Sequence, residues 1–228
     1  MDRTYICEYG RTAIGSFNGK LKQLSAPELS SKVIKHIIDK SKVGNNNIDE
    51  VIMGNVLTAG VGQAPARQAA LYAGLLESTR CMTINKVCGS GLKAIMLGDQ
   101  SIRLNHSNIV IAGGMESMSR APHFLKGSRE GIKFGDSKLI DSILNDGLWD
   151  PYNNMAMGNC GEILNKEENF SRDSQDAFAI ESYERSNHAI KKGWYKNEIV
   201  PITIKTKKED LVVDVDEEPL KFNKDKIK

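Results

Sequence analysis

Residues 82–91 read Met-Thr-Ile-Asn-Lys-Val-Cys-Gly-Ser-Gly. The first residues of this stretch are apolar or β-branched, as in a buried strand. Apolar residues then recur at helical spacing at Leu92, Ile95 and Met96. The sequence therefore predicts a strand that ends in a sharp turn and is followed at once by a helix, with Cys88 in the turn.

Strand-like and helical patterns alternate on both sides of this turn. Apolar runs predict strands at residues 4–9, 51–57 and 108–112, and helical periodicity predicts helices at residues 27–42 and 65–73. Strands that are apolar on both faces and alternate with helices are typical of a mostly parallel sheet covered by helices. We therefore predict an α/β layered fold.

The alternation stops after about residue 119. Gly, Pro, Asn and Asp then interrupt short helical pieces, such as the one predicted at residues 138–144. A strong helix follows at residues 172–192, and two runs at residues 199–206 and 211–215 predict a hairpin. This pattern predicts one layered domain in residues 1–118 and 196–228, with a loop-rich insertion at residues 119–195.

The composition excludes several classes of protein. The chain has 228 residues, of which 40% are hydrophobic and 26% charged, and its net charge is only +2. We therefore expect a globular protein that contacts neither nucleic acid nor membrane. The start of the chain lacks the pattern of a signal peptide, and the four cysteines form no CxxC pair. These features predict no metal site, reduced thiols and a cytoplasmic location.

The turn at Cys88 has two interpretations. A cysteine between a strand and a helix can be a small buried core residue, as most free cysteines are. Alternatively, its sulfur lies at the positive end of the helix, which favours the thiolate, and nearby backbone N–H groups can stabilise an oxyanion. In this second case Gly89 and Gly91 allow a substrate to approach the backbone. The residues alone leave both interpretations open.

The stretch from Asn85 to Leu92 resembles the acyl-enzyme signature of the thiolase family. The resemblance extends in the same order over about residues 3–218, nearly the whole chain. The segments that carry it are residues 11–17, 54–57, 62–68, 113–119, 146–148, 171–176 and 197–201.

This resemblance implies a function and a set of site residues. Cys88 would take an acyl group from an acyl-CoA, and the acyl-enzyme would then react with the carbanion of acetyl-CoA, making acetoacetyl-CoA or another 3-ketoacyl-CoA. The reverse reaction would cleave a 3-ketoacyl-CoA. The resemblance also assigns Leu148 and Met157 to substrate binding and Gly89 and Gly91 to the oxyanion turn. It implies no cofactor besides the coenzyme A thioester substrates, and a homo-oligomer, dimer or tetramer, whose contacts come from the insertion.

Two departures from the family pattern affect this prediction. Ala156 stands where the acetoacetyl-CoA-forming members carry a histidine, which makes a broader range of 3-ketoacyl-CoA substrates plausible. The family's Gly-His-Pro base and its Cys-Gly-Gly motif belong to a C-terminal half and do not occur in this sequence. We therefore expect the N-terminal half of a thiolase, with the C-terminal domain absent. The alternative function is a truncated half without turnover that binds acyl-CoA or associates with intact thiolase subunits.

Overall fold

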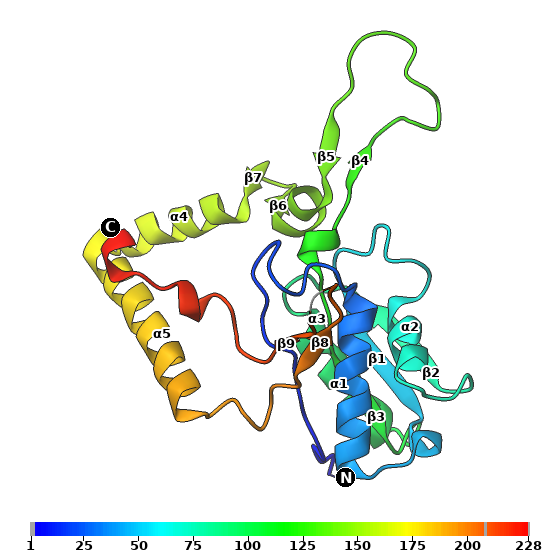
Figure 1. Cartoon of the computed structure of the whole chain (residues 1–228). Helices are drawn as coiled ribbons and strands as arrows, with labels where there is room; N and C mark the ends of the chain where they lie inside the picture. Colours follow the sequence, from blue (N-terminus) through cyan, green and yellow to red (C-terminus); the bar gives the residue numbers. More distant parts are fainter. Residues whose placement is uncertain (1–2, 208, 228) are drawn as a thin grey trace. The chain divides into compact units, whose positions relative to one another are not determined.

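A computed structural model describes residues 3–207 and 209–227 (Figure 1). The chain divides into two compact units: unit 1 holds Lys22–Trp149 with the N-terminal segment up to Tyr9, and unit 2 holds Gly10–Leu21 and the chain from Asp150 onward. The predicted division at residues 118/119 and 195/196 stays a prediction. Parts of the predicted layered domain, at residues 1, 2, 208 and 228, lie outside the described residues.

Unit 1 is built on a three-stranded sheet with the order β2-β1-β3. Its strands are β1 (Glu50–Gly54), β2 (Arg80–Ile84) and β3 (Val110–Gly114), and both pairings are parallel. Gly54 at the end of β1 pairs with Ile84 on one side and with Gly114 on the other, so the three strands end together. The predicted α/β fold with a parallel sheet is confirmed.

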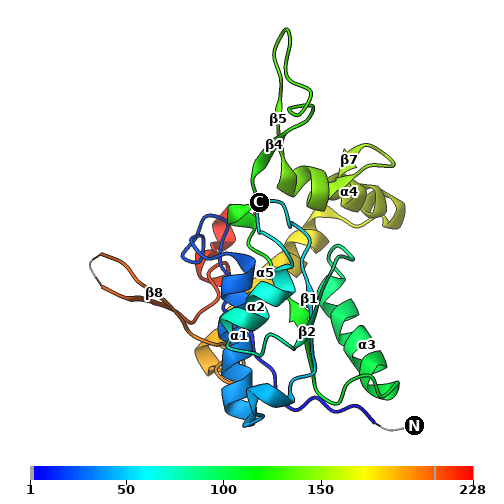
Figure 2. The same cartoon turned by 90° about the vertical axis from the view of Figure 1, so that its right-hand side faces the viewer.

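Helices cover both faces of this sheet (Figure 2). Helices α1 (Ala26–Ser41) and α2 (Pro65–Tyr72) pack on each other on one side, where α2 contacts β1 and β2. Helix α3 (Ser90–Arg103) packs on β1 and β3 on the other side. The core between them is made of buried aliphatic side chains, among them Ile34, Val51, Ala69 and Ile111.

Two predicted elements at the periphery of unit 1 are wrong. The segment predicted as a helix at residues 138–144 contains strand β5 (Leu139–Asp141), which pairs antiparallel with β4 (His123–Leu125) and leads into a π-helical turn, Ile143–Leu148. Cross-strand pairing overrides the local helical pattern there. The strand predicted at residues 4–9 is not formed, and its apolar residues Tyr5 and Ile6 are exposed.

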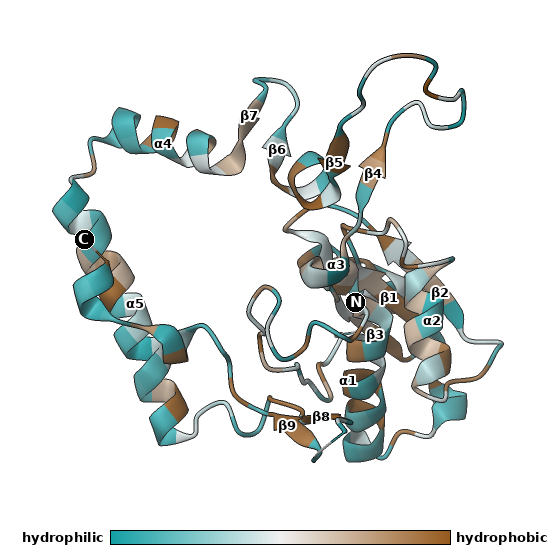
Figure 3. Ribbon diagram, turned by 45° about the horizontal axis from the view of Figure 1, so that its top comes forward, coloured by the Kyte–Doolittle hydropathy of each residue, from teal (hydrophilic) through white to brown (hydrophobic). Residues whose placement is uncertain are grey.

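Unit 2 contains two helices and a short hairpin. Helices α4 (Met157–Glu168) and α5 (Arg172–Lys192) precede β8 (Ile202–Ile204), which pairs antiparallel with β9 (Leu211–Val213). Residues along α5 are mostly hydrophilic (Figure 3). The predicted long helix and hairpin are confirmed.

The remaining short elements of the described residues, from both units, are strands β6 (Trp149–Asp150) and β7 (Met155–Ala156) and the 3-10 turns Asn45–Asn47, Met118–Arg120, Pro219–Lys221 and Lys224–Lys226.

An arginine ties the distant segments of unit 2 together. The guanidinium of Arg11 lies 2.7 Å from a carboxylate oxygen of Glu198 and 2.7 Å from one of Asp216. Burial alone would raise the pKa of Asp216, but the hydrogen bonds from Arg11 and from the Ile14 N–H outweigh it and lower that pKa. These contacts fix residues 10–21 against the segments around β8 and β9.

A substitution at Gly54 tests how closely α3 approaches the sheet. A Cβ added at Gly54 would lie 2.5 Å from the Cβ of Ser90 and 2.8 Å from the nitrogen of Gly91. Gly54→Ala should therefore lower the free energy of unfolding by roughly 1–3 kcal/mol, as overpacking does, measured by urea denaturation. The matched control is Gly113→Ala on β3, whose Cβ would meet the Met53 side chain at 3.6 Å. An equal loss in both variants would contradict this account.

Candidate functional site

The carboxyl ends of the three parallel strands form one edge of the sheet in unit 1. The segments that leave this edge begin at Asn55, Asn85 and Met115. In open α/β sheets this edge is where ligands generally bind, because the loops that follow the strands meet there. The turn that holds Cys88 is one of these loops.

Cys88 lies between β2, which ends at Ile84, and α3, which begins at Ser90. Gly89 is the N-cap of this 14-residue helix. The predicted strand–turn–helix arrangement is therefore confirmed. Cys88 is exposed and carries a free thiol, so it is not the buried core cysteine of the alternative interpretation. Its assignment as the nucleophile, which the family resemblance implies, stays a prediction.

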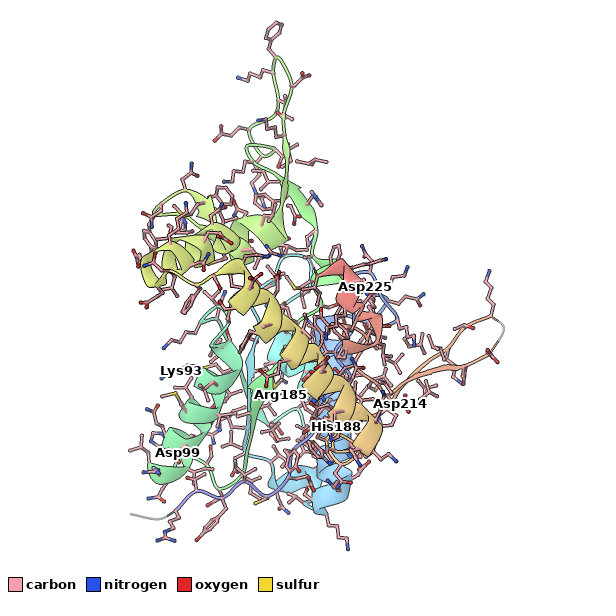
Figure 4. All side chains as sticks on the ribbon, turned by 90° about the vertical axis from the view of Figure 1, so that its left-hand side faces the viewer. Lys93, Asp99, Arg185, His188, Asp214 and Asp225 are labelled. Carbon is pink, nitrogen blue, oxygen red and sulfur yellow. The ribbon has the colours of Figure 1, made fainter. Side chains whose placement is uncertain are left out.

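The two glycines of the turn have different surroundings. The Gly89 N–H donates a hydrogen bond to the Lys86 carbonyl at 3.0 Å, so this donor is used within the turn. Gly91 lies against β3, since a Cβ there would be 3.5 Å from the nitrogen of Gly114. This glycine lets the first turn of α3 approach the sheet. Figure 4 shows this helix, on which Lys93 and Asp99 are labelled. The role of both glycines at an oxyanion stays a prediction.

The two predicted substrate-binding residues belong to different units. Leu148 ends the π-helical turn of unit 1 and is 37% exposed. Met157 is the first residue of α4 in unit 2 and is 42% exposed, directly after Ala156 at the N-cap. Both therefore have side-chain surface free for contact with another molecule, and their role in substrate binding stays a prediction.

A half-buried carboxyl group joins the loops after β1 and β3, and sequence reasoning assigned it no role. Glu116 accepts hydrogen bonds from the Val56 N–H at 2.9 Å and from the amide nitrogen of Asn55 at 2.7 Å. Burial raises the pKa of Glu116, and these hydrogen bonds oppose that rise. The sequence did contain a signal for this pair, because Asn55 and Glu116 are polar residues directly beyond apolar strands. The pair holds two loops of the sheet edge together.

Within residues 3–207 and 209–227, no cluster of three His, Cys, Asp or Glu side chains is placed to bind a metal ion. No helix in that part of the chain has the length and apolarity to cross a membrane. The predictions that the protein needs no metal or cofactor, and that it contacts neither nucleic acid nor membrane, stay predictions.

Comparison with known proteins places this turn in a family. Residues 4–227 match the family described as the thiolase N-terminal domain. The acetyl-CoA acetyltransferase of Yarrowia lipolytica is 50% identical over 228 residues, which are 100% of this chain and 57% of that protein. The acetyl-CoA acetyltransferase of Cupriavidus necator is 49% identical over 93% of this chain and 54% of its own length. This chain thus spans just over half of these relatives.

A solved structure is similar over the same extent. The crystal structure of Acat5 thiolase from Ascaris suum in complex with coenzyme A matches with a TM-score of 0.90 and 40% sequence identity. The match covers 96% of this chain and 55% of the Ascaris chain. The α/β fold described above is therefore a thiolase-like fold.

The four thiols should differ in reactivity. Burial raises the pKa of Cys81, so this thiol should react slowest with iodoacetamide at neutral pH. Cys88 should react fastest, because it is exposed and precedes the N-terminus of α3, whereas the exposed Cys7 precedes no helix. Peptide mapping after brief alkylation gives the order, with Cys160 as the fourth site. Equal labelling of all four thiols would contradict the placement of Cys88.

Proposed function

Because the chain belongs to the thiolase N-terminal domain family, we propose that it supplies the acyl-accepting part of a thiolase, an acyltransferase that acts on coenzyme A thioesters. The observation that supports this most directly is the exposed thiol of Cys88 between a parallel strand and a helix N-terminus. Cys88 and its flanking elements lie within the region that is 50% identical in sequence to the acetyl-CoA acetyltransferase of Yarrowia lipolytica. The proposal assigns Cys88 as the nucleophile.

The first half-reaction is acyl transfer to Cys88. The sulfur attacks the carbonyl carbon of an acyl-CoA, a new carbon–sulfur bond forms, and the bond to the coenzyme A sulfur breaks. Coenzyme A leaves as a thiol once its sulfur takes up a proton. This step stores the acyl group as a thioester on the protein and divides one difficult carbon–carbon step into two easier ones.

The second half-reaction needs a group that this sequence does not contain. A base must remove a proton from the methyl carbon of acetyl-CoA, and the carbanion then attacks the acyl group and frees the Cys88 sulfur. Neither a Gly-His-Pro nor a Cys-Gly-Gly segment occurs in the 228 residues. We assign this step to residues supplied from outside the chain, as in a whole thiolase of the relatives' length.

The substrate range follows from residues that this proposal places near the acyl group. Leu148 and Met157 would contact the acyl chain, and Ala156 would leave more space than the histidine of the acetoacetyl-CoA-forming pattern. We therefore propose that the complete enzyme makes or cleaves acetoacetyl-CoA and longer 3-ketoacyl-CoA substrates. No cofactor enters either half-reaction.

A second function is favoured by the surface of α3. Three apolar side chains on this helix are exposed: Leu92 at 67%, Ile95 at 48% and Met96 at 50%. An apolar helix face of this kind is typical of a surface that another polypeptide covers. The alternative proposal is that the chain performs no turnover but binds acyl-CoA or associates with intact thiolase subunits through such a face.

We also propose that the protein forms a homo-oligomer, a dimer or tetramer, through the β4–β5 hairpin. Figure 1 shows the long loop between these strands. This loop carries Phe134, which is fully exposed, and Ile132 at 50% exposure. Exposed aromatic residues of this kind are enriched in protein–protein interfaces.

We further propose a cytoplasmic location. The free thiols of all four cysteines agree with it, because thiols stay reduced in the cytoplasm.

Incubation with acetyl-CoA tests the proposed function. The chain should gain one acetyl group by intact mass, Cys88→Ala should abolish this gain, and the matched control Cys7→Ala should retain it. Condensation to acetoacetyl-CoA should be slower than in a whole thiolase by about 10²–10⁴ at least, because a positioned base is missing. Acetylation that persists in Cys88→Ala would remove Cys88 from the mechanism. Rapid condensation by the chain alone would show that the base lies within it.

Sedimentation velocity tests the hairpin contact. Phe134→Asp should lower the average mass of the assembly, because it places a charge in the proposed apolar contact. Lys133→Gln is the matched control, since it makes the same change in net charge at the neighbouring exposed position and should leave the mass unchanged. Equal masses for Phe134→Asp and the unmodified chain would rule out this hairpin as the contact.

A further inference from the structure

The residue before Cys88 has an unusual backbone conformation. Val87 has a φ of 47°, in the left-handed region, and its side chain is 49% exposed. For a β-branched residue this conformation is a genuine outlier, because Cβ crowds the backbone. Burial of the valine side chain does not account for it, so hydrogen bonds around the turn must hold it.

One backbone group and two side chains supply those hydrogen bonds, and the Ser90 N–H donates to the Val87 carbonyl at 3.1 Å. The Oδ1 of Asn85 accepts a hydrogen bond from the Val87 N–H at 2.9 Å. The hydroxyl of Ser90 donates to the Val87 carbonyl at 2.6 Å and accepts from the Lys86 N–H at 2.8 Å. A single hydroxyl therefore bridges backbone groups before and after the strained peptide.

Ser90 is itself fixed by the sheet. It is 5% exposed, and its Cβ occupies the space next to Gly54 at the end of β1. This packing fixes the Ser90 Cβ relative to the sheet, and the two hydrogen bonds orient its hydroxyl toward the turn. Cys88, next to Val87, is exposed, so its position depends on the backbone of the turn.

We propose that Ser90 is a positioning residue for Cys88: its hydroxyl holds Val87 in the left-handed conformation and so keeps the Cys88 sulfur in front of the first turn of α3. Ser90 touches neither substrate nor reacting atoms in this scheme and acts through the backbone of Val87. The inference rests on the proposed function, which assigns Cys88 as the nucleophile.

The test measures the alkylation rate of Cys88 relative to Cys7 in the same molecule. Ser90→Ala should lower this ratio about tenfold, the effect of losing hydrogen bonds that hold the turn. Ser90→Thr keeps the hydroxyl and should bring the ratio back toward that of the unmodified chain. Cys81 reports folding, because its half-buried thiol reacts slowly only while the sheet is intact. An unchanged ratio in a Ser90→Ala variant with a protected Cys81 would overturn the proposal.

A double variant separates positioning from general destabilisation. Glycine adopts a positive φ without strain, so Val87→Gly should make the loss of the Ser90 hydroxyl less harmful. The ratio should therefore fall less on Ser90→Ala in the Val87→Gly background than in the unmodified chain. Where Ser90→Ala alone exposes Cys81, the Val87→Gly change should restore its protection. An equal fall in both backgrounds, or no restored protection, would show that Ser90 does not act through Val87.

The alkylation readout also distinguishes this inference from the proposed function. A chain that fails to accept an acetyl group from acetyl-CoA, but whose Cys88 still depends on Ser90, would remove the proposed function and leave the positioning role. A chain that is acetylated at Cys88 with the same rate in Ser90→Ala would retain the function and remove the positioning role.

Discussion

The first turn of α3 lies directly on the ends of β1 and β3, and the candidate site depends on this close approach. It is possible because Gly54, Gly91 and Gly114 have no side chains at the contact: a Cβ at Gly114 would lie 3.3 Å from the Cα of Gly91. A helix held this close to a sheet has little freedom to slide or tilt, since packed interiors resist small displacements. The turn that precedes the helix inherits that rigidity, and Cys88 belongs to this turn.

The same edge of the sheet is stabilised from its other loops. Glu116 accepts hydrogen bonds from the backbone after β1, so the loops that follow β1 and β3 are joined at their start. The carboxyl group is half-buried, and its desolvation is offset by these donors. Covalent catalysis requires the nucleophile to be held within a fraction of an ångström of its working position. Under the proposed function, the glycine contacts below the turn, Ser90 within it and Glu116 beside it would meet that requirement.

The sequence predicted those elements whose signals are local. The helix at residues 172–192 was predicted to its ends because Ser171 caps it through the Ser174 N–H and its residues favour helix. The strand, turn and helix around Cys88 followed from a change of apolar period from two to 3.6. The segment at residues 138–144 was mispredicted because its strand depends on partners in β4, which lie far along the sequence.

The conformation of Val87 also could not be predicted from the local sequence. No propensity favours a valine with a positive φ, and its hydrogen bonds with the Ser90 hydroxyl, the Asn85 amide oxygen and the Ser90 N–H are visible only in the structure. The strained turn is an instance of a general pattern, in which a functional site departs from local preference and the surrounding structure compensates. The candidate nucleophile could be found from the sequence, whereas the residues that hold it could be found only from the structure.

The exposed thiol of Cys88 lies just before α3, and α3 carries exposed apolar side chains, which has a chemical consequence under the proposed function. A thioester formed on Cys88 in open solvent can be lost to water before a second substrate arrives, because closed active sites protect such intermediates by excluding water. Another polypeptide that covered Leu92, Ile95 and Met96 would bury their apolar surface. The same contact would exclude water from the region around the Cys88 sulfur. Under the proposed function, acylation uses the Cys88 thiol of this chain, whereas productive use of the acyl group needs both a base and a cover. That difference is why the chain alone is expected to accept an acyl group and to lack efficient condensation.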